Sequence, residues 1–271
     1  MVEAAYCTSA FNYVSDSGLV PVEVTVRNAR VDTPGPFDVV GFARTDAPSG
    51  VTDWGDPRHL DDVHRPEIEA AALDFTGCRH AVVYTPIVRS PEVASTIPDH
   101  APIETVHSDF TDDYRRMIHE PDRAYRGFLD PLLARDGLTT DDLRDASRIM
   151  MLQFWRNTGP VDADRPLALC DPRSVGEDRL VRMVVPDYGG VSLDFETFLV
   201  TAPDDAGDDA WYTFPQLTAN EVVLIRTYDS ECEAAGAAYW TPHSAFTDPH
   251  VAPGGPHARK SVEMRALCVW N

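Results

Sequence analysis

The second half of the chain is a succession of short segments rich in strand-forming residues and separated by turn residues. Such a series, with several strands in close succession and no long helix between them, predicts a β-sandwich or a β-barrel. The expected strands are Arg148–Arg156, Pro166–Cys170, Gly190–Val200, Trp211–Pro215, Glu221–Tyr228 and Arg259–Trp270.

The first half combines strand-like stretches with helical ones. Residues 66–75 predict a helix, because proline stands in the first turn, acidic residues lie near the positive end of the helix dipole, and Gly77 follows as a stop. Residues 111–135 are helical in pattern, with interruptions expected at Pro121 and Pro131, and Thr139–Asp142 resembles the capped start of another short helix. We expect these helices to brace the β core. Further strands are expected at Val20–Val31, Ala81–Val88 and Ile103–Asp109, with a loop over Val51–Pro66.

A chain of 271 residues is long enough to bury a substantial core in one domain. We expect a single domain over 1–271, in which residues 1–75 form an N-terminal extension and helix. Residues 76–271 then form the β core, with inserted helices over 111–147.

The net charge of −21 disfavours nucleic acids and anionic membranes as partners, since both would repel so acidic a surface. No apolar run is long enough to span a bilayer, and the N-terminus lacks a signal pattern, so we expect a cytoplasmic protein. The five cysteines are scattered without C-x-x-C spacing, which indicates buried free thiols. The acidity fits a salt-adapted cytoplasm and the near absence of lysine fits a GC-rich genome, and composition does not separate the two.

The triplet His107-Ser108-Asp109 predicts a metal site. Side chains two residues apart on a strand share a face, so an imidazole and a carboxylate project together, and a distant His243 can complete a set of two histidines and one carboxylate. This set binds non-haem iron(II) and leaves neighbouring coordination positions open for a 2-oxo acid and O2. His250 and His257 are weaker candidates, because they lie in a Pro- and Gly-rich loop.

Arg259 and Ser261 follow His243 at sixteen and eighteen residues. An R-x-S spacing on a strand sends both side chains to one face, and a guanidinium matches a carboxylate in charge and geometry. We therefore expect Arg259, with Ser261 beside it, to bind the far carboxylate of the oxo acid.

Six blocks in order carry a family resemblance. From about Thr76 onward the chain resembles the oxygenases that include the gibberellin desaturase-like proteins, the cephamycin 7-alpha-hydroxylase component and fungal meroterpenoid oxygenases. The blocks are TGCRHAVVYTPIVR, VHSDFT, FWRNTGPVDADRPLALCDPRSV, WYTFPQLTANEVVLIRTYDS, PHSAFTDP and ARKSVEMRAL.

The resemblance implies a double-stranded β-helix (jelly roll, cupin-like), mainly β with bracing helices, that uses Fe(II) and 2-oxoglutarate with O2 as co-substrate. In the family pattern the metal ligands fall on His107, Asp109 and His243, and the oxo-acid carboxylate falls on Arg259. The expected reaction is oxidation of a C–H bond, by hydroxylation, desaturation or cyclisation, of a small molecule in specialised metabolite biosynthesis. A homodimer is a possible assembly.

Other residues carry expectations that leave alternatives open. Arg156 is expected either as a second anion clamp or in a structural salt bridge, and Tyr212 either as core or as a hydroxyl that contacts the cofactor. Tyr84 and Arg89 are expected to line the substrate pocket, and Arg265 either to contact substrate or cofactor or to pair with an acid such as Glu263.

Two other functions remain open at this point. A cupin-like binding protein would keep the barrel without turnover. A zinc hydrolase on the same fold is the chemical rival, since zinc also accepts two imidazoles and a carboxylate.

Overall fold

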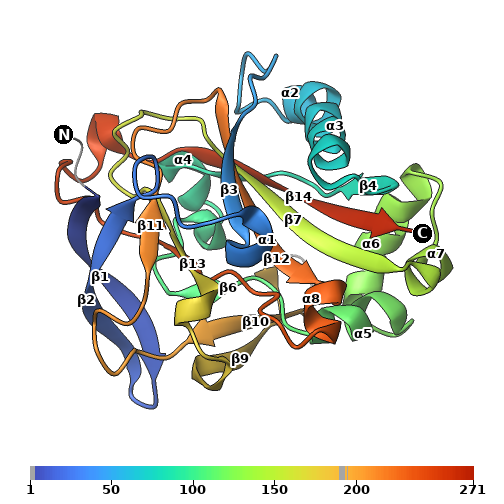
Figure 1. Cartoon of the computed structure of the whole chain (residues 1–271). Helices are drawn as coiled ribbons and strands as arrows, with labels where there is room; N and C mark the ends of the chain where they lie inside the picture. The colour runs from blue at the N-terminus through green and yellow to red at the C-terminus, as the bar shows by residue number, and fades with distance from the viewer. Residues whose placement is uncertain (1–3, 189–192, 194) are drawn as a thin grey trace.

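The computed structural model describes residues 4–188, 193 and 195–271 as two facing β-sheets with helices around them (Figure 1). The first sheet has eight strands in the order β1-β2-β11-β8-β13-β6-β10-β9. Their bounds are Ala5–Ser15 (β1), Gly18–Asn28 (β2), Trp211–Thr213 (β11), Leu167–Cys170 (β8), His243–Ala245 (β13), His107–Ser108 (β6), Phe195–Val200 (β10) and Leu180–Val185 (β9).

The second sheet follows the order β3-β12-β7-β14-β4, and β5 also pairs with β14. Figure 1 shows its three longest strands, β7, β12 and β14, side by side across the molecule. The bounds are Phe42–Asp46 (β3), Glu221–Asp229 (β12), Arg148–Asn157 (β7), Ser261–Trp270 (β14), His80–Val83 (β4) and Ile87–Arg89 (β5).

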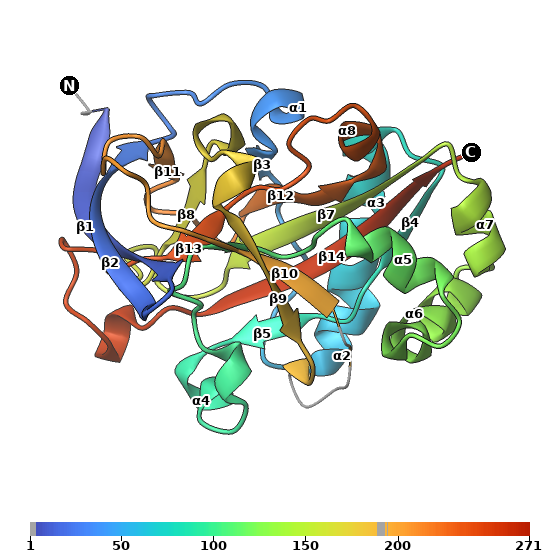
Figure 2. The ribbon, with the colours of Figure 1, turned by 90° about the horizontal axis from the view of Figure 1, so that it is seen from below.

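The helices cover the open faces and ends of the two sheets. In Figures 1 and 2, α5, α6 and α7 lie at the end of the molecule opposite the β1–β2 hairpin. Among the helices of the described residues, none is long and apolar enough to cross a membrane. The α-helix bounds are Phe37–Val40 (α1), Pro57–His59 (α2), Arg65–Thr76 (α3), Pro91–Ala94 (α4), Asp113–His119 (α5), Ala124–Arg135 (α6), Thr140–Asp145 (α7) and Ser230–Ala234 (α8).

Side-chain parity divides the second sheet into two buried faces. Even-numbered residues of β7 and β14, such as Met150, Leu152 and Met264, pack with Ile68 and Ala72 of α3 in one apolar cluster. Odd-numbered residues therefore face the eight-stranded sheet, because successive side chains alternate. Strands buried on both faces explain why β7 and β12 contain almost no exposed position.

The double-stranded β-helix expected from the sequence is confirmed, and several element bounds are corrected. The predicted loop over 51–66 contains α2 and a π-helical turn over Leu60–His64. The strand expected over 81–88 is divided into β4 and β5 on either side of Pro86, and β6 is only two residues long. Proline lacks the N–H that a sheet ladder requires, which explains the division at Pro86.

Some of the helical predictions are confirmed and one is wrong. α3 ends at Gly77, which adopts a left-handed conformation with φ 67°, and Thr139 and Asp142 form a capping box at α7. The predicted break at Pro131 is wrong, since α6 runs through it. Burial of Leu129 and Leu133 on either side holds the helix together despite the missing hydrogen bond. The predicted strand 190–200 lies partly outside the described residues, and β1, β3 and β9 were not predicted.

Candidate metal centre and adjoining cavities

Two short strands bring together the predicted metal ligands. His107 on β6 and His243 on β13 are direct register partners, and Asp109 follows two residues after His107. One ligand atom from each of the three side chains lies within 4.8 Å of the others, and all three residues are buried. The structure thus places a carboxylate and two imidazoles, from segments more than 130 residues apart, around one point between the sheets.

Both imidazoles are oriented in the same way. Nδ1 of His107 lies 2.8 Å from the carbonyl oxygen of Thr105, and Nδ1 of His243 lies 2.9 Å from that of Thr241. A carbonyl accepts, so each Nδ1 carries the proton and each Nε2 keeps its lone pair for a cation. Backbone carbonyls two residues upstream thus fix the tautomer of both rings.

The protonation states of His107 and Asp109 suit a metal ion. Burial, together with the neighbouring His243, lowers the pKa of His107 to about 4, so the ring is neutral near pH 7. Burial alone would raise the pKa of the Asp109 carboxyl, but the charge of Arg265 outweighs it and lowers the pKa below its usual range. With His243, the set offers two imidazoles and one carboxylate, which is the donor set typical of non-haem iron(II) sites.

A cavity of about 590 Å³ adjoins His107 and Asp109. Its walls are mainly apolar and aromatic, and they come from β5, β6, β9, β10, β14, α6 and neighbouring connecting segments. Three predicted residues, Tyr84, Arg89 and Arg265, also line it. The apolar and aromatic part of the wall includes Ile87, Ile103, Phe110, Tyr125, Phe128, Met183, Tyr188, Phe195 and Leu199.

A smaller void of about 20 Å³ adjoins all three candidate ligands and Arg259. Arg259 is buried, and no carboxylate of the described residues lies within 4.0 Å of its guanidinium. Its Nε donates to Oγ of Ser261 at 3.3 Å, and its Nη1 donates to the carbonyl of Arg165 at 3.2 Å. Burial and the charge of Arg89 lower the pKa of Arg259 to about 9, as expected for a cation without a neighbouring anion.

Trp155 supplies a second donor at this void. Its ring lies under the Arg259 guanidinium, with 5.0 Å between Cζ and the ring centroid, and its buried Nε1 has no acceptor among the residues that the structure describes. A buried guanidinium without an ion pair and an indole N–H without an acceptor both favour an anion. The void therefore fits the carboxylate of a bound acid.

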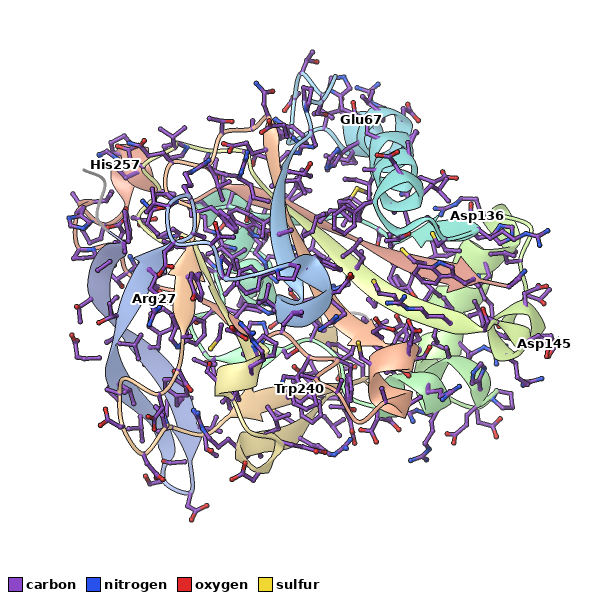
Figure 3. All side chains as sticks on the ribbon, in the orientation of Figure 1. Arg27, Glu67, Asp136, Asp145, Trp240 and His257 are labelled. Carbon is purple, nitrogen blue, oxygen red and sulfur yellow. The ribbon has the colours of Figure 1, made fainter. Side chains whose placement is uncertain are left out.

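Two predicted cofactor residues lie away from both cavities. Arg156 donates to the carbonyls of Ala47 and Ala219, and its guanidinium stacks over Trp54 at 5.3 Å. Parity explains this position, because Trp155 faces the void and the next side chain on the strand faces away. Tyr212 packs in an apolar cluster beneath Arg27, which Figure 3 labels on the outer side of the β1–β2 hairpin. Both side chains therefore have structural contacts in place of the predicted cofactor contacts.

The two alternative histidines also lie apart from the centre. His250 is exposed and contacts the carbonyl of Tyr6. Nδ1 of His257 lies 2.9 Å from Oδ2 of Asp162, and Figure 3 shows His257 at the edge of the molecule.

Sequence reasoning missed the residues that orient the centre. Thr105 and Thr241 act through backbone carbonyls, which no side-chain pattern reports. Gln153 donates to Glu263 at 3.2 Å, and the spacing of Gln153 and Trp155 on one strand face is the signal that could have placed both at the void.

Comparisons with known proteins agree with this geometry. A family model described as an oxidoreductase/YMDC permease-like domain matches residues 5–269. The hydroxylase/desaturase CTB9 of Cercospora beticola is 30% identical over 164 residues, which cover 58% of this chain and 47% of that protein. The oxidoreductase chry3 of Gibberella zeae is 24% identical, with 88% of this chain and 86% of that protein covered.

Solved structures share the fold. A single-residue variant of NvfI, an iron and alpha-ketoglutarate-dependent endoperoxidase, superposes with a TM-score of 0.78 and 21% sequence identity over 100% of this chain and 99% of that one. A second structure of NvfI, in a different conformation, gives 0.77 and 20% over the same shares.

Proposed function

Because the chain belongs to the oxidoreductase/YMDC permease-like domain family, matched over residues 5–269, we propose that it is an iron(II)- and 2-oxoglutarate-dependent oxygenase of a small molecule. The observation that carries the proposal is the convergence of His107, Asp109 and His243 within 4.8 Å, beside the buried Arg259, which forms no ion pair with any residue that the structure describes. The names of NvfI and of the hydroxylase/desaturase relative support this chemistry. Membership of the gibberellin desaturase-like group stays a prediction.

Each group of residues at the centre has a separate role. His107, Asp109 and His243 hold the iron, which, with 2-oxoglutarate and O2, supplies the oxidising power to break a C–H bond. Arg259 receives the distal carboxylate of 2-oxoglutarate, assisted by Ser261 and by the indole N–H of Trp155. The neutral His107 and the ionised Asp109 need no proton release at pH 7 before the metal binds.

The 590 Å³ cavity receives the substrate. The apolar walls of the cavity exclude water from the metal centre. A substrate that fills the cavity is held with one of its C–H bonds close to His107 and Asp109. A cavity of this size suits a drug-sized metabolite more than an amino acid. We place the reaction in specialised metabolite biosynthesis, in keeping with the hydroxylase/desaturase relative.

The first test is anaerobic binding to the metal-free chain. Fe(II) followed by 2-oxoglutarate should produce a weak visible charge-transfer band, which zinc in place of iron should not produce. Admission of O2 should then form succinate. A protein that binds iron without forming the band or succinate would be a binding protein, and an O2-independent hydrolytic activity with zinc would indicate the hydrolase.

A further inference from the structure

Four charged side chains of alternating sign form a line that ends at the carboxylate of Asp109; three of them are buried, and Arg265 is partly exposed. Arg89 lies 3.5 Å from Glu263, Glu263 lies 3.2 Å from Arg265, and Nη2 of Arg265 donates to Oδ2 of Asp109 at 3.1 Å. Burial alone would lower the pKa of Arg265, but Asp109 and Glu263 outweigh it and raise the pKa above the usual value. Arg265 is therefore charged near pH 7.

The two oxygens of Asp109 differ in their surroundings. Oδ2 is occupied by Arg265, whereas Oδ1 lies 3.8 Å from Nε2 of His107, on the side of the imidazoles. A carboxylate with one oxygen held by a guanidinium has one oxygen left for a cation. The side chain is thus preset to bind through Oδ1.

Arg265 itself has little freedom to move. It lies on β14 opposite Gln153 of β7, and its guanidinium stacks over Phe110 at 5.8 Å. Glu263, two residues earlier on the same face, is held from its other side by Arg89 and Gln153. Arg89 is fixed in turn by the carbonyls of Asp99 and Ala101 and by the hydroxyl of Tyr188.

We propose that Arg265 is a positioning residue that makes Asp109 a one-oxygen metal ligand. Binding through both oxygens would occupy an additional coordination position, which the oxo acid and O2 need. Arg265 keeps that position open by holding Oδ2, and Glu263, which accepts from the same Nη2, helps to hold the guanidinium in place. The inference rests on the proposed function, because it concerns the same metal centre.

The test measures metal affinity and not turnover. Arg265→Gln removes the charge and shortens the side chain, and Co(II) affinity of the metal-free protein should fall about 10- to 100-fold, as when other outer partners of metal ligands are removed. Arg265→Lys keeps the charge and should recover most of the affinity. Arg179→Gln is the matched control: Arg179 pairs with the buried Asp209, its side chain has the same 17% exposure as Arg265, and it lines neither cavity.

The control separates positioning from general stability. Arg179→Gln should lower the melting temperature without changing Co(II) affinity. The proposal is overturned if Arg265→Gln binds Co(II) as tightly as the unmodified protein, or if Arg179→Gln weakens Co(II) binding equally.

A crystal structure of the unmodified protein with Co(II) decides the matter even if Arg265→Gln does not fold. Asp109 should reach the metal through Oδ1 alone, with Oδ2 still on Arg265, and two metal-bound oxygens would refute the inference. If the unmodified protein binds no metal at all, the proposed function itself fails, which is a distinguishable result.

Discussion

His107 and His243 are paired across adjacent antiparallel strands, with ring centroids 4.4 Å apart and planes inclined by 53°. Each ring is held by a carbonyl two residues upstream in its own segment. The distance between the two imidazoles is therefore set by the backbone pairing of β6 with β13, and not by contact between the two rings. Backbone pairing thus places the two rings side by side before any metal binds.

Loss of one imidazole should abolish tight metal binding. His243→Ala or His107→Ala leaves two of three ligands, and Co(II) affinity should fall by more than the roughly 10- to 100-fold typical of removing an outer partner. His250→Ala is the control, because His250 is exposed and lies outside both cavities. Calorimetric titration of the metal-free proteins provides the measurement. Equal weakening by His250→Ala would contradict the assignment.

Arg259→Met should weaken 2-oxoglutarate binding to the metal-loaded protein and leave metal affinity unchanged. A hydrogen bond to a charged group contributes about 1.5–3 kcal/mol, which corresponds to about a 10- to 100-fold loss of affinity. Arg259→Lys should restore part of it, since an ammonium keeps the charge without the fork. The measurement is anaerobic titration of the oxo acid.

Arg156→Met provides the matched comparison for Arg259. Arg156 is also buried and lies on β7, the neighbour of β14, which begins two residues after Arg259, but the guanidinium of Arg156 donates to two backbone carbonyls. The variant should be less stable and bind the oxo acid normally. If Arg259→Met binds 2-oxoglutarate normally, or if only Arg156→Met loses affinity for it, Arg259 is not the residue that binds the distal carboxylate.

Local spacing predicted the part of the centre that lies within single short segments. His107 and Asp109 are two residues apart and line the same cavities, and Arg259 and Ser261, also two residues apart, are joined by a hydrogen bond. Arg156 and Tyr212 were assigned without knowing which parity faces inward, and the structure places both away from the cavities. Which alternate side chains of a strand point between the sheets is decided only by how the two sheets face each other, and this is a property of the tertiary structure.

Apart from His243, which the family pattern placed with His107 and Asp109, contacts between distant segments could not be predicted from the sequence. The donation from Arg265 to Asp109 joins β14 to the segment after β6, over 156 residues. Gly41 meets Thr241 over 200 residues. No sequence periodicity predicts such contacts, because they depend on how α1 and β3 pack against β12 and the segment before β13.

Gly41→Ala should destabilise the protein and weaken metal binding together. Gly41 has φ 76°, and a Cβ there would lie 2.3 Å from Oγ1 of Thr241, whose carbonyl holds His243. Gly137→Ala is the control, since φ is 72° and no atom lies within 4 Å of the added Cβ. The left-handed backbone costs each variant about 1–2 kcal/mol, so a larger loss in Gly41→Ala measures the contact with Thr241. Urea unfolding and Co(II) titration provide both readouts, and equal behaviour of the two variants would show that the close approach is unimportant.

The buried His64 should make the metal-free protein less stable as the pH falls below 6.5. Burial lowers the pKa of His64 to about 4, although a hydrogen bond with Glu67 opposes the shift. Between pH 6.5 and 4 the unfolded chain binds a proton that the folded chain excludes, so acidification favours unfolding. The shift corresponds to about 3 kcal/mol of unfolding free energy over that window.

His64→Gln removes the titrating group and should flatten the pH dependence by that amount. Urea unfolding in EDTA at several pH values between 7 and 4 measures the difference. Chelation keeps metal release from His107 and His243 out of the comparison, since metal bound only to the folded state adds its own pH-dependent stability. Parallel profiles for His64→Gln and the unmodified chain would mean that His64 protonates in the folded state as readily as in the unfolded one.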